Sequence, residues 1–379
     1  MRSAPLAGIR VLDLTRLLPG PLCGQHLADL GAEVIKIEDT GAGDYVRPAL
    51  RPLLNRGKRG LQLNLKSEDG KAVLRMLVQT ADALIEGFRP GSMARLGVSY
   101  EDLREFNPRL VYCSITGFGQ EGTRASAASH DLNYVALTGV LDQAGGANGA
   151  PVLPGFQIGD ILGGTMSATV GILAALLDAR SSGLGRHVDV AMADAVMTHC
   201  VLAVSEINST GVESRQGRGS NTGGTARYNL YRTRDDRFLA VAAQEKKFWD
   251  AFCGIIDRPD LAQEPPATGE GAERVRRDVA TAIGRLTLQE WMPRFAAVDC
   301  CVSPVHSVSE AVEDPELRRR GVVKKQGREY RLGLPFKLSE FEVDVFKVSP
   351  AGGEDTDEIL GELGYTSEQV QQMRAAGVV

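Results

Sequence analysis

Short apolar runs alternate with helical segments along the first half of the chain. Each run is short, rich in branched apolar residues and bounded by turn residues, which is typical of buried strands. The predicted strands are residues 9–15, 32–38, 82–88 and 110–116. The predicted helices between them end at Leu30, span 68–80 and span 100–106. Strands that alternate with helices in this way predict a parallel, doubly wound α/β sheet, a Rossmann-like arrangement.

The pattern changes after residue 220. Two strand-like runs, 228–233 and 237–243, are separated by a polar turn and predict a β-hairpin. Helical segments follow over 246–256, 274–286 and from Thr287 onward, where Thr287 and Glu290 have the spacing of a capping box. We therefore predict a smaller α+β domain.

The predicted domain boundaries follow these changes of pattern. A large domain covers residues 1–200, and the C-terminal residues from about 325 to 379, which include helices over 354–363 and 367–375, return to it. The small domain covers 220–315, and residues 201–219 and 316–324 are linkers. A chain of 379 residues suits two domains of this kind.

Composition narrows the possible functions. The net charge is −5, so no broad basic field indicates nucleic acid or an anionic membrane as a partner. Six scattered cysteines without CxxC spacing indicate reduced thiols and no thiolate zinc site, and the five histidines form no HExxH motif. The N-terminus lacks the apolar core of a signal peptide, and no apolar run reaches 18 residues. We expect a cytoplasmic protein without a bound metal, a nucleic-acid partner or a membrane partner.

The turn after the first strand argues against a dinucleotide cofactor. Residues 15–21 read Thr-Arg-Leu-Leu-Pro-Gly-Pro, which is not GxGxxG. Without those glycines the backbone cannot surround a pyrophosphate at the helix N-terminus in the usual way.

Two polar segments are candidates for chemistry on their residue types alone. The first is basic and contains Asn55, Arg56, Lys58 and Arg59. Lysine and arginine at this spacing can hold phosphates, and the alternative is a solvated turn. The second is the pair His130 and Asp131, in which the carboxylate can orient the imidazole and raise its basicity, and the alternative is a surface or helix-capping role.

A third candidate, Asp160, precedes an apolar helix. The helix N-terminus is expected to hold this carboxylate ionised, so a simple N-cap and a catalytic group are both consistent with its position. Gly163 and Gly164 follow it where alanine would be the better helix former, which suggests close approach of a ligand to the backbone. Glu245, at the end of the second hairpin strand, is by itself the N-terminal carboxylate of the next helix.

Taken together, the motifs resemble the class III coenzyme A-transferase superfamily (CaiB/BaiF type), which also contains the α-methylacyl-CoA racemases. The resemblance extends over nearly the whole chain, in order and in spacing. The matching stretches are residues 12–14, 19–21, 27–38, 55–59, 86–91, 107–112, 117–119, 130–134, 159–160 and 185–192.

The resemblance implies an interlocked homodimer, in which each chain has a Rossmann-like large domain and a small domain joined by long linkers. It also implies an acyl-CoA substrate, with coenzyme A arriving as part of that substrate and no permanently bound cofactor. The residues that would bind coenzyme A or the thioester are Asn55, Arg56, Lys58, Arg59, Leu63, Asn64, Leu65, Lys66, Arg89, Ser129, Asn133 and Tyr134.

Two chemistries divide this superfamily. In the transferases, the aspartate at the position of Asp160 attacks a donor thioester and forms an aspartyl-CoA intermediate. In the racemases, the same aspartate and a histidine exchange the α-proton on opposite faces of an enolate. The His130–Asp131 pair and its spacing to Asp160 agree with the racemases, and Glu245 would then hydrogen-bond the histidine.

Some positions depart from the racemase pattern. Ser129 replaces a glycine, Asp39 stands where a racemase has an arginine near the nucleotide, and residues 41–45 and 334–339 resemble transferases. We predict a racemase or epimerase of 2-methylacyl-CoA thioesters, with a CoA-transferase as the alternative. A CoA-binding protein without catalysis is a third hypothesis, against which the joint presence of His130, Asp160 and Glu245 argues.

Overall fold

The computed structural model describes residues 3–41, 43–145, 149–213, 216–263 and 269–379. The chain divides into two compact units. The first comprises Met1–Thr138, Phe156–His199 and Pro315–Val379, and the second comprises Gly139–Gly155 and Cys200–Asp314. Every predicted catalytic residue except Glu245 lies in the first unit.

A six-stranded parallel sheet forms the centre of the first unit. Its strands are β1 (Arg10–Asp13), β2 (Glu33–Glu38), β3 (Arg59–Gln62), β4 (Ala83–Glu86), β5 (Val111–Thr116) and β6 (His187–Ala191). They are ordered β3-β2-β1-β4-β5-β6, and the register places Leu12 beside Ile35 on one side and beside Leu84 on the other. This order confirms the predicted doubly wound α/β fold, in which the strand order reverses between β1 and β4.

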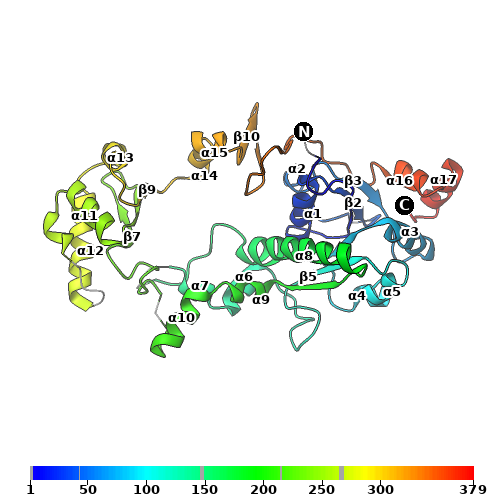
Figure 1. Ribbon diagram of the computed structural model, residues 1–379, viewed down its shortest axis with the longest axis horizontal. Coiled ribbons are helices and arrows are strands. Elements are labelled where there is room, and N and C mark those ends of the chain that lie inside the picture. Colours follow the sequence, from blue (N-terminus) through cyan, green and yellow to red (C-terminus); the bar gives the residue numbers. More distant parts are fainter. Residues whose placement is uncertain (1–2, 42, 146–148, 214–215, 264–268) are drawn as a thin grey trace. The chain divides into compact units, whose positions relative to one another are not determined.

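Helices cover both faces of this sheet (Figure 1). Alternate residues of each strand point to opposite faces, so that Leu12 and Val11 belong to two different cores. Helix α3 (Glu68–Thr80) packs in the core that contains Leu12. Helices α1 (Pro19–Asp29) and α8 (Ser167–Ser182) pack in the core that contains Val11.

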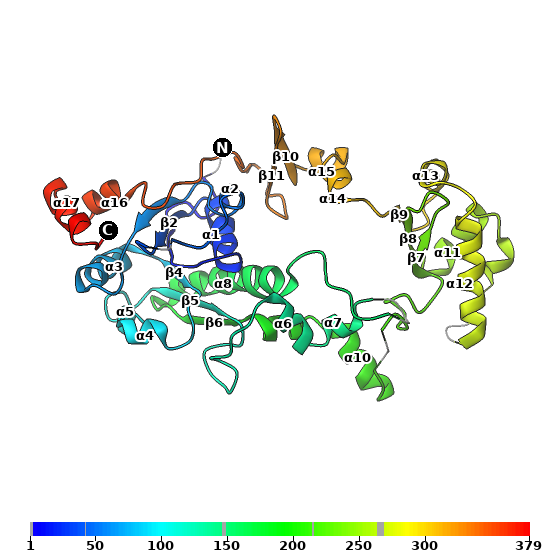
Figure 2. The same ribbon diagram turned by 180° about the vertical axis from the view of Figure 1, so that it is seen from behind.

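The C-terminal helices α16 (Thr356–Glu362) and α17 (Ser367–Ala375) belong to the first unit and lie beside α3 (Figure 2). Ile359 and Val370 enter the same core as Leu12. The sequence analysis did not predict the antiparallel hairpin β10 (Val323–Gln326) and β11 (Glu329–Leu332), because both strands are short and mostly polar. The remaining helices of this unit are α2 (Arg51–Leu54), α4 (Ser92–Leu96), α5 (Tyr100–Arg104), α6 (Asp131–Leu137), α9 (Met192–Thr198) and α15 (Pro315–Arg319).

The second unit is an antiparallel sheet packed against helices. Its strands are β7 (Tyr228–Arg232), β8 (Phe238–Ala242) and β9 (Val302–Pro304). The predicted hairpin is confirmed as β7 and β8, and Thr287 forms the predicted capping box with Glu290. The helices of this unit are α7 (Val140–Gln143), α10 (Val201–Thr210), α11 (Lys246–Ile255), η2 (Pro259–Ala262), α12 (Gly269–Ile283), α13 (Leu288–Ala296) and α14 (Val308–Ala311).

One continuous helix of the first unit is unusually apolar. Residues Gly159–Ser182 have a mean hydropathy of 1.6 over their most apolar window, enough in length and composition to cross a membrane. Ala168 and Ile172 of this helix are buried against the sheet, as in the core helix of a globular α/β domain. Packing accounts for this buried face of the helix, whereas Val170 and Leu177 of the same helix are exposed.

Candidate active site

Strand β5 ends at Thr116, and the chain then runs over the surface to His130, the N-cap residue of α6. The backbone N–H of His130 donates a hydrogen bond to Asn133 Oδ1 at 3.0 Å. Because the cap is made by the backbone of His130 and the side chain of Asn133, the exposed imidazole is not needed to start the helix. It is therefore free for another role.

Asp131 connects the start of α6 to Asp160. Its Oδ1 atom accepts a hydrogen bond from the backbone N–H of Asp160 at 3.0 Å, although 29 residues separate them. Gly159 makes this approach possible, since a Cβ atom there would lie 2.8 Å from Tyr134 Cδ2 and 3.0 Å from Asp131 Oδ1. The structure thus brings His130, Asp131 and Asp160 together.

Asp160 lies in the first turn of a π-helix, η1 (Gly159–Met166), which continues directly into α8. Gly163 and Gly164, predicted as points of ligand approach, have a packing role in the structure. A Cβ atom on Gly163 would lie 2.6 Å from Met192 O, and one on Gly164 would lie 2.7 Å from Pro19 Cβ. These glycines let η1 pack closely on α9 and on the start of α1.

The carboxyl group of Asp160 is not held ionised in the way that its helical position suggested. Burial raises its pKa, the neighbouring Asp131 carboxylate raises it further, and His130 lowers it, so that the pKa reaches about 6. The expected effect of the helix N-terminus is therefore outweighed by the loss of water around the carboxyl group. A carboxyl with a pKa near 6 can gain or lose a proton close to neutral pH.

Ser129 and Tyr134 support the same segment. The Ser129 hydroxyl donates to Tyr134 Oη at 3.2 Å, and the buried Tyr134 ring packs edge-on against Phe118 with 5.6 Å between ring centroids. The ring also contacts the backbone at Gly159 closely enough to exclude a side chain there. Both residues therefore fix the position of α6 relative to Asp160.

Glu245 lies in the second unit. It is the N-cap residue of α11, and its side chain is exposed. Its predicted hydrogen bond to His130 stays a prediction.

The basic segment at 55–59 is largely folded into the first unit. Arg56 is buried and forms an ion pair with Asp29, and Lys58 is buried and forms an ion pair with Asp13 at 2.8 Å. Arg59 reaches across the surface to three glutamates, Glu33, Glu358 and Glu362. Asn55 is also buried, and its amide donates to Asp44 Oδ2 at 3.0 Å. Phosphate binding by these four residues stays a prediction.

A small hollow of about 90 Å³ lies at the carboxyl ends of β1, β2 and β4. Leu63, Leu65, Lys66 and Asp39 line this hollow. Asn64 does not line it and donates to the Gly377 carbonyl. Arg89 is exposed and follows Phe88, which lines the hollow. The sequence analysis missed Arg16, which lies 4.0 Å from Asp39 and whose guanidinium is 4.8 Å from the Phe88 ring centre. Its place directly after the first strand is the signal that could have identified it, because ligands of parallel sheets bind at that edge.

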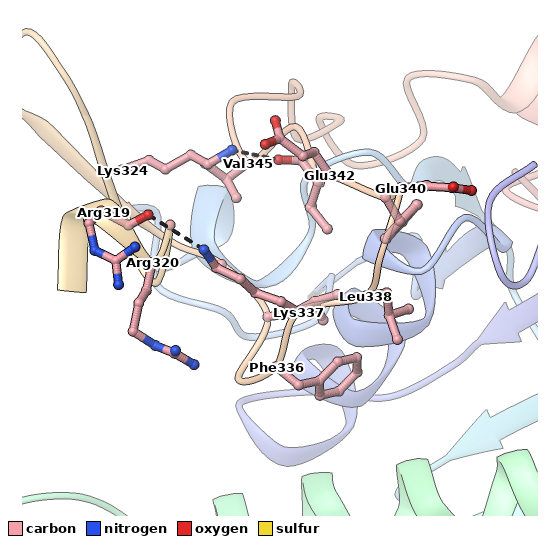
Figure 3. Close-up of a pocket in the computed structure, with 14 residues that line it drawn as sticks. Arg319, Arg320, Lys324, Phe336, Lys337, Leu338, Glu340, Glu342 and Val345 are labelled. Atoms are coloured by element: carbon pink, nitrogen blue, oxygen red, sulfur yellow. Dashed lines mark hydrogen bonds between the residues drawn. The ribbon is translucent and has the colours of Figure 1, made fainter. Parts of the chain in front are cut away.

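A larger hollow, about 1080 Å³, lies elsewhere in the first unit (Figure 3). It is formed by residues 319–345 around β10, and Lys324 and Lys337 cross it to donate to the carbonyls of Val343 and Arg319. The predicted site residues do not line it. Among the side chains that the structure describes, no group of three or more His, Cys, Asp or Glu is arranged to hold a metal ion.

Comparison with known proteins identifies the family. The sequence pattern of CoA-transferase family III matches residues 6–356. This chain belongs to CoA-transferase family III. The resemblance seen in the sequence is thereby confirmed.

Relatives of two activities occur at similar identity within this superfamily. The chain is 33% identical to the alpha-methylacyl-CoA racemase of Homo sapiens, over 99% of this chain and 97% of that protein. It is 31% identical to the formyl-CoA:oxalate CoA-transferase of Escherichia coli O157:H7, over 98% of this chain and 99% of that protein. The chain is therefore an enzyme of the family, and sequence identity alone does not choose between the two activities.

Solved structures share the fold. A CAIB/BAIF family protein from Brucella suis matches with a TM-score of 0.83 and 26% identity, over 96% of this chain and all of that one. A hypothetical protein from Mycobacterium tuberculosis matches with a TM-score of 0.81 and 28% identity, over 94% of this chain and 99% of that one. The six-stranded parallel sheet with smaller antiparallel sheets is thus the architecture of CaiB/BaiF-type proteins.

Proposed function

We propose that this enzyme racemises or epimerises 2-methylacyl-CoA, or a similar branched acyl-CoA, by 1,1-proton transfer. The observation that carries the proposal is the meeting of His130, Asp131 and Asp160 in the first unit, with a hydrogen bond of 3.0 Å from the Asp160 backbone to Asp131. A nucleophilic aspartate needs no imidazole beside it. A proton exchanged between two faces of a carbon needs two acid–base groups, and His130 and Asp160 are two such groups.

A 1,1-proton transfer requires a carboxyl group that changes its protonation state near neutral pH. The α-proton of a thioester is removed to give an enolate, and a second group returns a proton to the other face. Asp160, whose pKa is raised to about 6 by burial and by Asp131, accepts a proton more readily than an ordinary aspartate. His130 is exposed beside it and serves as the opposite group.

We further propose that the coenzyme A nucleotide binds at the hollow where the strand order reverses. The hollow is lined by residues that follow β1 and β4, among them Arg16 and Phe88, and by the predicted residues Leu63, Leu65 and Lys66. Open parallel sheets bind ligands at this switch point. Arg16 and Lys66 are cations of this hollow, beside the carboxylates of Glu38, Asp39 and Asp44, and they are the groups that would contact a phosphate.

Deuterium exchange tests the proposed reaction. Chiral 2-methylacyl-CoA thioesters incubated with the enzyme in deuterium oxide are expected to gain one deuterium at the α-carbon, detected by mass spectrometry. Absence of exchange across a panel of branched acyl-CoA substrates would contradict the proposal. If the panel binds but does not exchange, a CoA-transferase and a binding protein without catalysis remain, and trapping of an activated Asp160 separates these two.

A CoA-transferase is the second candidate, favoured by the carboxyl group of Asp160 and by the transferase relatives. In that reaction Asp160 Oδ attacks the donor thioester and expels the CoA thiolate, which leaves a mixed anhydride. The thiolate then attacks the Asp160 carbonyl and releases the donor acid, which leaves an aspartyl-CoA thioester from which CoA passes to the acceptor acid. Hydroxylamine would convert the activated Asp160 into a hydroxamate, visible as a mass shift of its peptide. The racemase proposal expects no such shift on incubation with any acyl-CoA donor.

We also propose a homodimer. In the first unit, Val170 and Leu177 on α8 are 63% and 69% exposed, and in the second unit Val201 and Leu202 on α10 are 65% and 66% exposed. Large apolar side chains gathered on exposed helical faces are typical of surfaces that another chain covers. Light scattering is expected to give twice the chain mass of 40.6 kDa, and a particle of the single-chain mass would contradict the proposal.

The raised pKa of Asp160 predicts a distinct pH dependence. For the enantiomer whose α-proton Asp160 removes, the carboxyl must be ionised, and below a pKa of about 6 it is increasingly protonated. The value of kcat/KM should therefore fall about tenfold per pH unit below pH 6. An acidic limb near pH 4, where an ordinary aspartate titrates, would show that burial does not control this group.

A further inference from the structure

A cluster of buried charges lies at the end of β1, below the loop that joins it to α1. The side chains of Asp13, Lys36 and Lys58 are fully buried. Lys58 Nζ lies 2.8 Å from Asp13 Oδ2, and Lys36 Nζ lies 3.3 Å from Asp13 Oδ1. Burial alone would raise the pKa of Asp13, but the two ammonium groups outweigh it and lower the pKa to about 2. Asp13 is thus ionised. Burial lowers the pKa of Lys58 to about 8 although Asp13 opposes the fall, so Lys58 keeps its positive charge at neutral pH.

Lys58 uses its ammonium group entirely within the protein. It donates to Asp13 Oδ2 at 2.8 Å, to the Pro21 carbonyl at 2.8 Å and to Asn55 Oδ1 at 2.9 Å. An ammonium group has three N–H donors, so none is left for a phosphate of coenzyme A. The sequence reveals that Lys58 is a basic residue, but it does not reveal the three acceptors that its ammonium group contacts.

These hydrogen bonds fix both ends of the segment 15–21, which comprises the loop after β1 and the first turn of α1 and is called loop 15–21 below. At its start, Asp13 Oδ1 accepts hydrogen bonds from the Thr15 N–H at 3.0 Å and from the Thr15 hydroxyl at 2.5 Å. At its end, the Pro21 carbonyl accepts from Lys58. The space around the cluster is full, because a Cβ atom on Gly24 would lie 2.6 Å from Asp13 Oδ2. Lys58 Nζ therefore links the two ends of the loop, through Asp13 at one end and the Pro21 carbonyl at the other.

The same loop supports the helix that carries Asp160. The Pro19 carbonyl accepts a hydrogen bond from the buried Thr165 hydroxyl at 2.7 Å. Gly164 packs so closely on Pro19 that a Cβ atom would lie 2.7 Å from the proline ring. Thr165 follows Asp160 by five residues, which is one turn of a π-helix, so the contact is one turn from the reacting carboxyl.

We propose that Lys58 is a positioning residue for Asp160, which acts by holding loop 15–21 against the π-helix that carries this aspartate. This inference rests on the proposed function for the role of Asp160. It assigns Lys58 to the geometry of the reacting group and not to the binding of coenzyme A. Its effect passes through Pro21 and Pro19 to Thr165.

Substitution of Lys58 by methionine tests the proposal. Methionine has a similar length, leaves the Asp13–Lys36 pair in place and removes the donor to Pro21. As the loop loosens, water reaches Asp160, and because burial is the main cause of its raised pKa, the pKa should fall from about 6 by about one unit or more. Carbon-13 NMR of aspartate-labelled enzyme measures this pKa, and the spectrum of an Asp160→Asn variant identifies the resonance.

The alternative role of Lys58 predicts a different result. If Lys58 contacts a phosphate, Lys58→Met weakens the binding of free coenzyme A, measured by calorimetry, and leaves the pKa of Asp160 unchanged. If Lys58 positions Asp160, the Kd for coenzyme A stays within about twofold and kcat for exchange falls roughly 10- to 100-fold. Lys71→Met is the matched control, since Lys71 lies on α3 and pairs with the exposed Glu68. It should change neither quantity.

A second variant keeps the test informative if Lys58→Met folds poorly. Thr165→Val removes the hydroxyl that donates to Pro19 and leaves the charge cluster intact. It should lower the pKa of Asp160 in the same direction as Lys58→Met, and the double variant should show less than the sum of the two effects, because both break one chain of contacts. Additive effects, or an unchanged Asp160 pKa in both single variants, would overturn the proposal.

The two proposals can fail separately. The pKa of Asp160 is measured without substrate, so it tests the role of Lys58 even if no branched acyl-CoA exchanges its α-proton. Absence of exchange in the unmodified enzyme, together with a lowered Asp160 pKa in Lys58→Met, would reject the proposed function and retain the positioning role.

Discussion

Asp160→Asn is expected to lower the rate of α-proton exchange roughly 10³- to 10⁴-fold for the enantiomer whose α-proton Asp160 removes, the upper range for loss of a positioned acid–base group. Asparagine has nearly the same shape and cannot take up the α-proton. The hydrogen bond to Asp131 is retained, since its donor is the backbone N–H of residue 160. The loss should therefore appear in kcat for exchange, measured by deuterium incorporation, and the Kd for coenzyme A should change little.

The control for this variant is Asp69→Asn, which changes an exposed aspartate in the first turn of α3, outside the candidate site. It should leave exchange unchanged. If Asp160→Asn exchanges the α-proton of both enantiomers within tenfold of the unmodified enzyme, Asp160 is not a proton-transfer group.

His130→Gln is expected to give the second largest effect, and one that depends on the enantiomer. Two groups on opposite faces remove the α-proton from opposite enantiomers, so the variant should lose exchange about 10²- to 10³-fold for the enantiomer that uses His130. For the other enantiomer, Asp160 can still remove and return the proton. Exchange without inversion should therefore persist for that enantiomer, as measured by deuterium content and chiral separation of the recovered thioester.

Glutamine at position 130 leaves the helix cap intact, because the cap joins the backbone of residue 130 to Asn133. His306→Gln in the second unit is a matched control at an exposed histidine and should have no effect. Equal loss for both enantiomers would mean that His130 holds the substrate and does not transfer a proton to one face.

Much of the fold could be predicted from the sequence because its elements carry strong local signals. Helix α3 has the predicted bounds, with a serine cap at Ser67 and two acidic residues in its first turn. Strand β5 is an apolar run buried along its whole length, as expected of a parallel strand with a neighbour on each side and helices on both faces of the sheet. The hairpin of β10 and β11 was missed because a short polar hairpin lacks the apolar alternation on which prediction depends.

The residues that meet in the candidate site could be predicted from the sequence, but their hydrogen bonds and pKa shifts could not. His130, Asp131 and Asp160 were identified from their motifs, whereas the bond from Asp131 to the Asp160 backbone depends on the tertiary fold. The π-helical turn and the burial that raises the pKa of Asp160 leave no local mark in the sequence. Lys58 shows the same limit, since its partner Asp13 lies 45 residues earlier in the chain.

The stereochemical course of one reaction tests the central claim most directly. The enzyme is incubated in deuterium oxide with a single enantiomer of a 2-methylacyl-CoA, and the configuration and deuterium content of the recovered thioester are measured over time. The account predicts that each molecule of inverted configuration carries one α-deuterium and that the Asp160 peptide keeps its mass. Recovery of the starting enantiomer without deuterium, together with a CoA adduct on the Asp160 peptide, would contradict it.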